Sequence, residues 1–415
     1  MINKMHISVS FCVFVLCVCS AYTLVLIPKP SNNIKLSERI GNFSVELIDR
    51  TLTQTPNSNV VISPLTIWTV LAVIAEGSAS NTLKEVCNTL RIAPENLRSV
   101  RESFKRIEKY LVVKTTTVEL NKLNILFVDK GVSPTQKFAL IAKDYNVSFA
   151  TLNFSEPYKT ANFVNSKVYN FTQGKISDLI SGDDLTNSHM ILTSALYFKG
   201  QWTFKFNKSA TTKAPFFDNQ GNVIGQVNMM YNRQILPFAN FKDLKARIIE
   251  LPYGKENRLS MLVMLPYQNV TVNEMFLNLN QISLDHILAN LAMSINEFPE
   301  DEIDIYLPRF KVKTNLDLTD TLKSMGIKDL FDSSQSNLKK MVKIPSYVSK
   351  IAHKAVIEVT EEGTTAAAAA AAAFSYRIGV TKFEANRPFG YMIVEKTTNT
   401  IPFAGSYNMP ELYES

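Results

Sequence analysis

Few residues of this 415-residue chain are of the types that catalyse reactions or bind metals. Beyond residue 21 the chain has three histidines, His189, His286 and His353. Asp285 and His286 are adjacent, but they lie in an ordinary helical pattern, SLDHILANL, with no serine motif to accompany them. The sequence contains no G-x-S-x-G, H-E-x-x-H, P-loop or G-x-G-x-x-G motif. We therefore expect no metal, no cofactor and no enzyme activity, and a hydrolase of unfamiliar type is the weakest alternative.

Cys87 is the single cysteine beyond residue 21, so no intramolecular disulfide can stabilise that part of the chain. In NTLKEVCNTL it shares one helical face with Leu83, Val86 and Leu90. This spacing predicts a small buried apolar side chain, and a reactive thiol is the alternative. Stability must then come from a large core, which the 46% hydrophobic content allows.

The charge of the chain is mildly basic, with 44 Lys and Arg against 37 Asp and Glu. A basic helical stripe stands out in PENLRSVRESFKRIEKYL, formed by Arg98, Arg101, Lys105 and Lys109. Glu102 dilutes it, so we interpret the stripe as a solvated helix face, with a polyanion site for a glycosaminoglycan as the alternative. We expect no nucleic-acid partner.

Residues 1–21 have the layout of a secretory signal peptide, with Lys4 near the start, an apolar run from Ile7 to Cys19, and small residues at Ser20 and Ala21. No later stretch reaches the roughly 18 apolar residues of a membrane span. We therefore predict a secreted, extracellular protein without a membrane anchor. Six Asn-x-Ser/Thr sequons are candidate glycosylation sites: Asn42, Asn146, Asn153, Asn170, Asn207 and Asn269.

The first half of the sequence shows mainly helical periodicity, whereas the second half contains paired apolar strands such as ARIIELPYGKENRLSMLVMLP. Helices and strands are mixed along the chain without a regular βαβα alternation, which indicates an α+β fold built on antiparallel sheets. No Gly/Ser linker interrupts the chain, so a single domain is the simplest interpretation.

The most unusual stretch is EEGTTAAAAAAAAFSYRIGV, residues 361–380, with eight consecutive alanines. Alanine has the highest helix propensity, so on composition alone this is a helical spacer or low-complexity linker. Its flanks suggest another interpretation. Five segments in order along the chain resemble the serpins: NVVISPLTIWTVLAVIAEGS (59–78), LTSALYFKGQW (192–202), LPRFKV (307–312), KIAHKAVIEVTEEGTTAAAA (350–369) and FEANRPFGYMIVEKTTNTIPFAGSYNMP (383–410).

The resemblance implies a single serpin domain over residues 35–410, after an N-terminal extension at 22–34 and before a tail at 411–415. It implies three β-sheets, about nine helices and an exposed reactive-centre loop at about 361–385, which a protease cleaves and which then inserts into the central sheet. Such insertion is a known example of strand addition. The implied hinge consists of small residues together with an acidic one: Glu361, Gly363, Thr364, Ala366, Ala367, Ala368 and Ala369.

Alanine suits a segment that is solvated before cleavage and buried afterwards, because it is tolerated in both environments. Along an inserted strand, alternate residues such as Ala366 and Ala368 would face the core. Family spacing places the cleaved bond 14 residues after Gly363, at Arg377–Ile378. Tyr376 and Lys382 are alternative cleavage sites that require a shifted register.

The resemblance also implies a set of residues that gate the opening of the central sheet: Ser63, Thr66, Ser194, Trp202 and His353. Ser194 departs from the family pattern, which usually has asparagine there, so the hydrogen bonds that close the sheet are expected to differ. The resemblance implies a monomeric suicide-substrate inhibitor of trypsin-like serine proteases in an extracellular cascade such as clotting, melanisation or immune signalling. A non-inhibitory serpin that acts as a carrier, storage or binding protein is the alternative.

Overall fold

The computed structural model describes residues 35–363 and 381–414, so most of the reactive-centre loop lies outside it. The helical periodicity of the first half is confirmed. Ten α-helices form in the described residues: α1 (Leu36–Gln54), α2 (Pro64–Gly77), α3 (Ser80–Thr89), α4 (Leu97–Leu111), α5 (Gln136–Asp144), α6 (Pro157–Phe171), α7 (Gly182–Leu185), α8 (Val272–Leu279), α9 (Leu284–Glu297) and α10 (Thr319–Ser324). The count depends on elements as short as the four-residue α7, which explains the small difference from the expected nine.

The strands of the described residues begin early but concentrate after residue 190. They are β1 (Val60–Ile62), β2 (Val113–Lys114), β3 (Val118–Asp129), β4 (Val147–Leu152), β5 (Met190–Gly200), β6 (Thr212–Phe217), β7 (Val223–Gln234), β8 (Phe238–Phe241), β9 (Ala246–Tyr253), β10 (Leu259–Pro266), β11 (Ile303–Asp317), β12 (Lys350–Val359), β13 (Thr381–Glu384), β14 (Phe389–Glu395) and β15 (Thr400–Tyr407). One sheet has the order β1-β15-β14-β10-β9-β8.

The remaining strands form two sheets that share one long strand, β11. Its second half, Phe310–Asp317, pairs with β12. From β12 the order of paired strands is β5, β3 and β2, and β4 also pairs with β3. Its first half, Ile303–Arg309, pairs with β7, and β13 runs parallel to it on the other side. Counted by pairing, the three sheets expected from the sequence are present, and two of them are continuous through β11.

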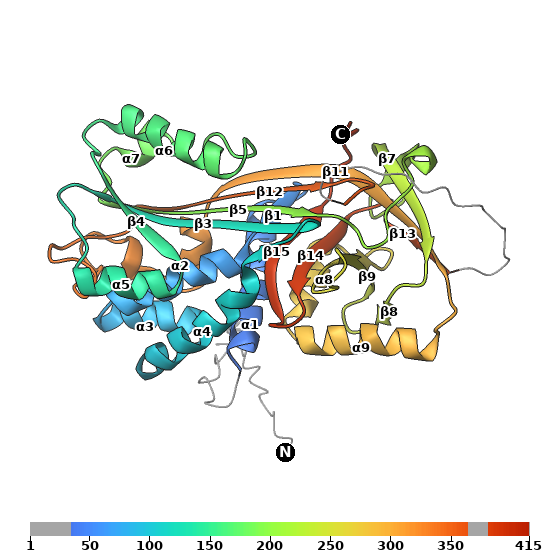
Figure 1. Cartoon of the computed structure of the whole chain (residues 1–415), viewed down its shortest axis with the longest axis horizontal. Coiled ribbons are helices and arrows are strands. Elements are labelled where there is room, and N and C mark those ends of the chain that lie inside the picture. Colours follow the sequence, from blue (N-terminus) through green and yellow to red (C-terminus); the bar gives the residue numbers. More distant parts are fainter. Residues whose placement is uncertain (1–34, 364–380, 415) are drawn as a thin grey trace, which may run out of the picture.

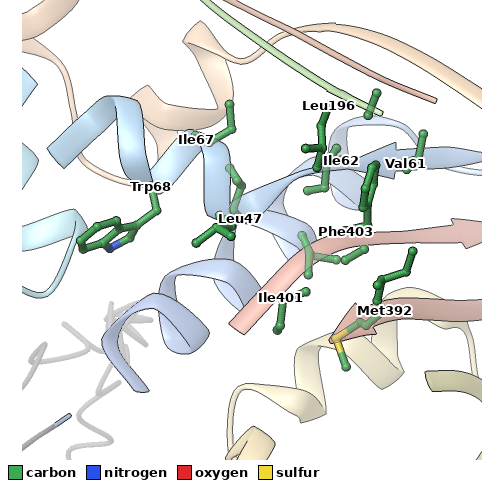
Figure 2. Packing of buried hydrophobic residues seen from close by; sticks show 14 of the residues in the cluster. Leu47, Val61, Ile62, Ile67, Trp68, Leu196, Met392, Ile401 and Phe403 are labelled. Carbon is green, nitrogen blue, oxygen red and sulfur yellow. The ribbon is translucent and has the colours of Figure 1, made fainter. Parts of the chain in front are cut away.

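Helices cover both faces of the long central sheet. Figure 1 shows α6 and α7 above the strands β3, β5 and β12, and α1 to α5 on the opposite side. The main core lies between this sheet, α1, α2 and the six-stranded sheet. Figure 2 shows Leu47, Trp68 and Phe403 among the buried side chains that meet there. Among the described residues no helix is long and apolar enough to cross a membrane.

Cys87 is fully buried in α3, as its helical spacing predicted. Burial raises the pKa of its thiol to about 12. The thiol is therefore protonated at neutral pH and behaves as a small apolar group.

The close approach of β15 to β1 leaves no space for a side chain at Gly405, so we predict that a substitution there destabilises the fold. A Cβ atom at Gly405 would lie 1.9 Å from the backbone oxygen of Val60 and 2.7 Å from the Tyr391 hydroxyl. We expect Gly405→Ala to lower the free energy of unfolding by about 1–3 kcal/mol or more, measured by urea denaturation. Gly41→Ala is the control, since a Cβ atom there meets nothing within 4 Å. An equal effect of both variants would contradict this prediction.

Candidate functional site

The central residues of the predicted reactive loop lie outside the described part of the chain: Thr364, Ala366, Ala367, Ala368, Ala369, Tyr376, Arg377 and Ile378. The structure does describe both points where this loop joins the protein, the end of β12 and the start of β13. It also describes the sheet next to them. No group of three or more metal-binding side chains occurs in the described residues.

The hinge begins in a tight turn at the end of β12. Thr360 N donates to Gly363 O at 2.9 Å, and Gly363 N donates to Thr360 O at 3.0 Å. Gly363 also forms an antiparallel bridge with Gln201, just beyond the end of β5. Gly363 therefore already lies between the extensions of β12 and β5, with the chain direction reversed relative to β12.

Only glycine fits at position 363 without rearrangement. Its φ angle is +109°, which is unfavourable for residues with a Cβ atom. A Cβ atom there would lie 2.3 Å from the backbone oxygen of Gly200 and 2.5 Å from the amide nitrogen of Trp202. The turn is thus packed directly against the backbone that follows β5.

Trp202 donates two hydrogen bonds to this turn. Its indole Nε1–H donates to Thr360 O at 2.9 Å, and its backbone N–H donates to Glu362 O at 3.0 Å. The indole stacks on the ring of Tyr253 with 4.3 Å between centroids and 14° between planes. Trp202 therefore contacts the predicted hinge directly.

The two glutamates of the turn are also held by side chains. The buried carboxylate of Glu361 accepts a hydrogen bond from the Thr211 hydroxyl at 2.6 Å, and its Oε1 lies 3.3 Å from Arg309 Nη1. Glu362 pairs with Lys205 at 3.1 Å. Each contact would have to break if the turn left this position, so the closed hinge is stabilised by several charge-assisted bonds.

The other four gating residues form a separate buried cluster beneath the middle of the sheet. Ser63 N donates to His353 Nε2 at 3.0 Å, and the Ser194 hydroxyl donates to the Thr66 hydroxyl at 2.6 Å. Thr66 in turn donates to Ser63 O at 3.0 Å. The start of α2 is therefore bonded to β5 through Ser194 and to β12 through His353.

His353 must be neutral to maintain this cluster, because its Nε2 accepts a hydrogen bond. Burial lowers the pKa of His353 to about 4, against a smaller opposite effect from the backbone of Ser194. Its Nδ1 has no well-formed hydrogen bond among the described residues. Ser194 lies opposite His353 in the β5–β12 register but bonds to Thr66 instead.

Next to both clusters, β5 and β12 pair directly with each other. The pairing is parallel and runs from Lys350 with Ile191 to Val356 with Tyr197. A strand that entered the sheet between them would have to separate these pairs. His353 and Ser194 form the central pair of this register. The hinge cluster lies beyond the Val356–Tyr197 end, about 25 Å from Ser194 along β5 and its extension.

Three ion pairs attach β12 to the segment that covers it. At intervals of four residues along the strand, Lys350 pairs with Asp184 at 2.7 Å, Lys354 with Asp178 at 2.5 Å, and Glu358 with Lys175 at 3.4 Å. The partners come from α7 and from the chain between α6 and α7, which lie over this sheet face (Figure 1). We call these contacts the β12 ion-pair ladder.

The residues that sequence reasoning missed are partners of the hinge. Tyr253, Thr211 and Arg309 contact Trp202 or Glu361, yet they come from three separate segments of the chain. Nothing in their local sequence indicates these contacts, because only the folded sheets bring them together.

The candidate surface sites remain predictions. In the basic stripe on α4, Arg101 lies 3.6 Å from Glu76 and from Asp144, and Lys105 lies 3.4 Å from Asp144. Half of the stripe is therefore neutralised by acidic neighbours, while Arg98 and Lys109 are exposed. Among the sequons, Asn146, Asn170 and Asn269 are exposed, and Asn42, Asn153 and Asn207 are partly buried.

The comparisons with known proteins agree with this geometry. A family model described as serpin (serine protease inhibitor) matches residues 38–410. The leukocyte elastase inhibitor of Homo sapiens is 31% identical over 386 residues, 91% of this chain and 100% of that protein. Leukocyte elastase inhibitors are protease inhibitors rather than enzymes, which confirms the expectation that this chain has no enzyme activity.

Solved structures show the same fold. Serpin-12 of Manduca sexta superposes with a TM-score of 0.78 at 25% identity and covers 90% of this chain and 99% of its own. Native protease nexin-1, solved with heparin, has a TM-score of 0.76 at 28% identity and covers 90% of this chain and 99% of its own. The predicted α+β architecture is confirmed.

The prediction of a secreted, extracellular protein is wrong by this comparison. Leukocyte elastase inhibitors, which align with nine tenths of the chain, are intracellular serpins. The apolar pattern of residues 1–21, on which that prediction depended, lies outside the described residues.

The low pKa of His353 predicts a loss of stability in acid. Between pH 6.5 and about 4 the unfolded chain binds a proton at this site and the native state does not, so stability falls as the pH falls. We expect His353 to account for about 2–3 kcal/mol of the decrease in unfolding free energy between pH 7.5 and 4.5. Urea denaturation of His353→Asn should show a correspondingly smaller decrease. The exposed His189→Gln is the control, and an unchanged pH dependence in His353→Asn would contradict the assignment.

The tight packing at the hinge predicts a large effect of Gly363→Ala. Both the positive φ angle and the backbone contacts oppose a Cβ atom, so we expect a loss of about 1–3 kcal/mol in unfolding free energy. Gly221→Ala is a matched control, because Gly221 has a φ of +90° but a Cβ atom there would meet nothing within 4 Å. Trp fluorescence would report whether the turn has moved away from Trp202. Equal losses in the two variants would show that the packing contributes nothing.

Proposed function

Because this chain belongs to the serpin family, we propose that it inhibits trypsin-like serine proteases as a suicide substrate cleaved at Arg377–Ile378. In this proposal the protease forms an acyl-enzyme at Arg377, and the cleaved loop enters the central sheet between β5 and β12. Relatives that are named as protease inhibitors support the inhibitory part of the proposal, whereas the trypsin-like target and the cleaved bond are our inference for this chain.

The position of Gly363 is the observation that carries the proposal. The turn at Thr360–Gly363 reverses the chain, so the residues that follow would run antiparallel to β12. Because β5 is parallel to β12, the same strand would be antiparallel to β5 as well. Insertion would then replace one parallel pairing with two antiparallel pairings, which are slightly more stable per residue.

The length and composition of the loop suit this strand. From Gly363 to Arg377 is 14 steps, about 45 Å of extended chain. About a dozen new backbone hydrogen bonds at about 0.5–1.5 kcal/mol each would contribute on the order of 10 kcal/mol before packing is counted. A gain of this size makes trapping effectively irreversible if insertion is faster than hydrolysis of the acyl-enzyme.

Arginine at the cleaved bond supports a trypsin-like target, because such proteases carry an aspartate at the base of the specificity pocket. Lys382 is a weaker candidate for the cleaved position. It lies within β13, where it pairs with Asp304 of β11 and its carbonyl oxygen accepts from Arg247 at 3.3 Å. A protease would have to detach this strand before it could bind Lys382 in an extended conformation.

The first test mixes the purified protein with trypsin and examines the mixture by denaturing electrophoresis. We expect a complex that survives denaturation and a released peptide that begins at Ile378. Arg377→Ala should abolish the complex with trypsin, whereas Lys382→Ala should leave it intact. Clean cleavage at Arg377 with fully active trypsin would contradict inhibition of this enzyme, and a peptide that begins at Phe383 would contradict the assigned bond.

The alternation of the alanines gives a second test with a built-in control. A charge at Ala368 would be buried after insertion, whereas a charge at Ala369 would point to the other face of the strand. We expect Ala368→Arg to convert the protein mainly into a substrate and Ala369→Arg to retain most of the inhibition. The stoichiometry of inhibition measures this difference, and equal values for the two variants would argue against insertion in this register.

A further inference from the structure

A cleft outside the hinge lies beside β13, where the chain leaves the reactive loop. It has a volume of about 400 Å³ and is lined by residues of four segments, among them Phe217, Arg247, Tyr267, Asn386 and Arg387. Arg247 belongs to β9, and Arg387 lies between β13 and β14. The proposed inhibitory mechanism uses none of these side chains directly.

Two arginine side chains enter this cleft and contact backbone oxygens there. Arg247 Nη1 donates to Lys382 O at 3.3 Å, and Arg387 Nη2 donates to Pro266 O at 2.6 Å. Within the described residues neither guanidinium forms an ion pair with a carboxylate. Since each guanidinium carries five N–H donors, most of their hydrogen-bonding capacity remains available.

Both arginines line the same cleft, and their charges influence each other. Burial lowers the pKa of Arg387, and the neighbouring charge of Arg247 lowers it further, while Glu384 acts in the opposite direction. Among the described residues Asp218 is the one carboxylate that lines the cleft, and its Oδ1 accepts hydrogen bonds from the backbone N–H groups of Gln220 and Asn222 at 2.9 and 2.8 Å. The protein groups that line the cleft therefore leave it with a net positive charge.

We infer that this cleft binds a tetrahedral oxyanion, a phosphate or a sulfate, between Arg247 and Arg387. Planar guanidinium groups bind such anions through paired N–H donors, and an anion would relieve the repulsion between the two arginines. The volume falls within the range of small-molecule clefts, so the oxyanion can be carried on a small organic group. Tyr267 and Asn386 can donate further hydrogen bonds from the cleft wall.

A bound anion would connect segments that are distant in sequence. Arg247 already holds the backbone of β13, and Arg387 holds the end of β10 at Pro266. An oxyanion between them would fasten β9, β10 and β13 at the point where the reactive loop ends. This inference concerns ligand binding and does not depend on the proposed protease inhibition.

The test titrates the whole protein with inorganic phosphate and with sulfate at constant ionic strength set by chloride, and follows binding by calorimetry and the shift in thermal unfolding. We expect saturable binding and stabilisation beyond that given by chloride. Arg247→Gln should weaken the affinity about tenfold or more, because it removes charge-assisted hydrogen bonds. Arg247→Lys should weaken it less. Lys242→Gln is the matched control, as it removes the same charge from a nearby exposed position.

A sugar phosphate and a sulfated disaccharide extend the titration to organic ligands. Tighter binding of either than of the free ion would identify an oxyanion carried on an organic group, and equal binding would identify the free ion. Absence of saturable binding by all four probes would overturn the inference. So would an affinity that is equally weakened by Arg247→Gln and Lys242→Gln. Arg387→Gln is a secondary variant, because its half-buried side chain also supports Pro266.

Discussion

The pairing of β5 with β12 is the constraint on which the rest of this protein depends. Two strands are hydrogen bonded in parallel along Ile191–Tyr197 and Lys350–Val356, although the chain that follows β12 already turns back toward the space between them. Hydrogen bonds from other segments hold the pairing at its middle and the turn beyond one end. Ser63 and Thr66, at the start of α2, contact the middle through His353 and Ser194, and Trp202 holds the turn. The native sheet is thus closed by a small number of identifiable contacts, and their role in gating its opening is still a prediction.

The sequence was most informative where one residue type has one physical use. Gly363 is predicted to be the hinge residue, and its φ of +109° and backbone contacts show that the position requires glycine. Cys87 was predicted to be buried from its helical spacing, and it is. The α+β class followed from periodicity, and the assignment to three sheets followed from the family resemblance. The cleaved bond and the outcome of loop cleavage are still predictions, since Arg377 lies outside the described residues.

Other parts of the site could not be predicted, because they depend on contacts between distant segments. Glu361 is recognisable as an acidic residue next to the hinge, but its partners Thr211 and Arg309 are separated from it by 150 and 52 residues. The β12 ion-pair ladder also joins residues that are distant in sequence, and so does the cleft lined by Arg247 and Arg387. The secreted location failed for a different reason. An apolar N-terminal pattern is a local signal, and the intracellular relatives outweigh it.

The continuity of β11 through two sheets has a geometric consequence for the reactive loop. Both ends of the loop are attached to this one strand, since β12 pairs with its second half and β13 with its first. Thr381 is aligned with Ile303 and Val359 with Phe310, so the two anchor points are about 23 Å apart along β11. A strand inserted from Gly363 would run away from β13, carrying residue 377 about 45 Å down the sheet. The four steps from residue 377 to residue 381 span at most about 14 Å. While β13 stays paired, the intact chain is therefore too short to allow complete insertion. The loop can insert completely only after the peptide bond is cut.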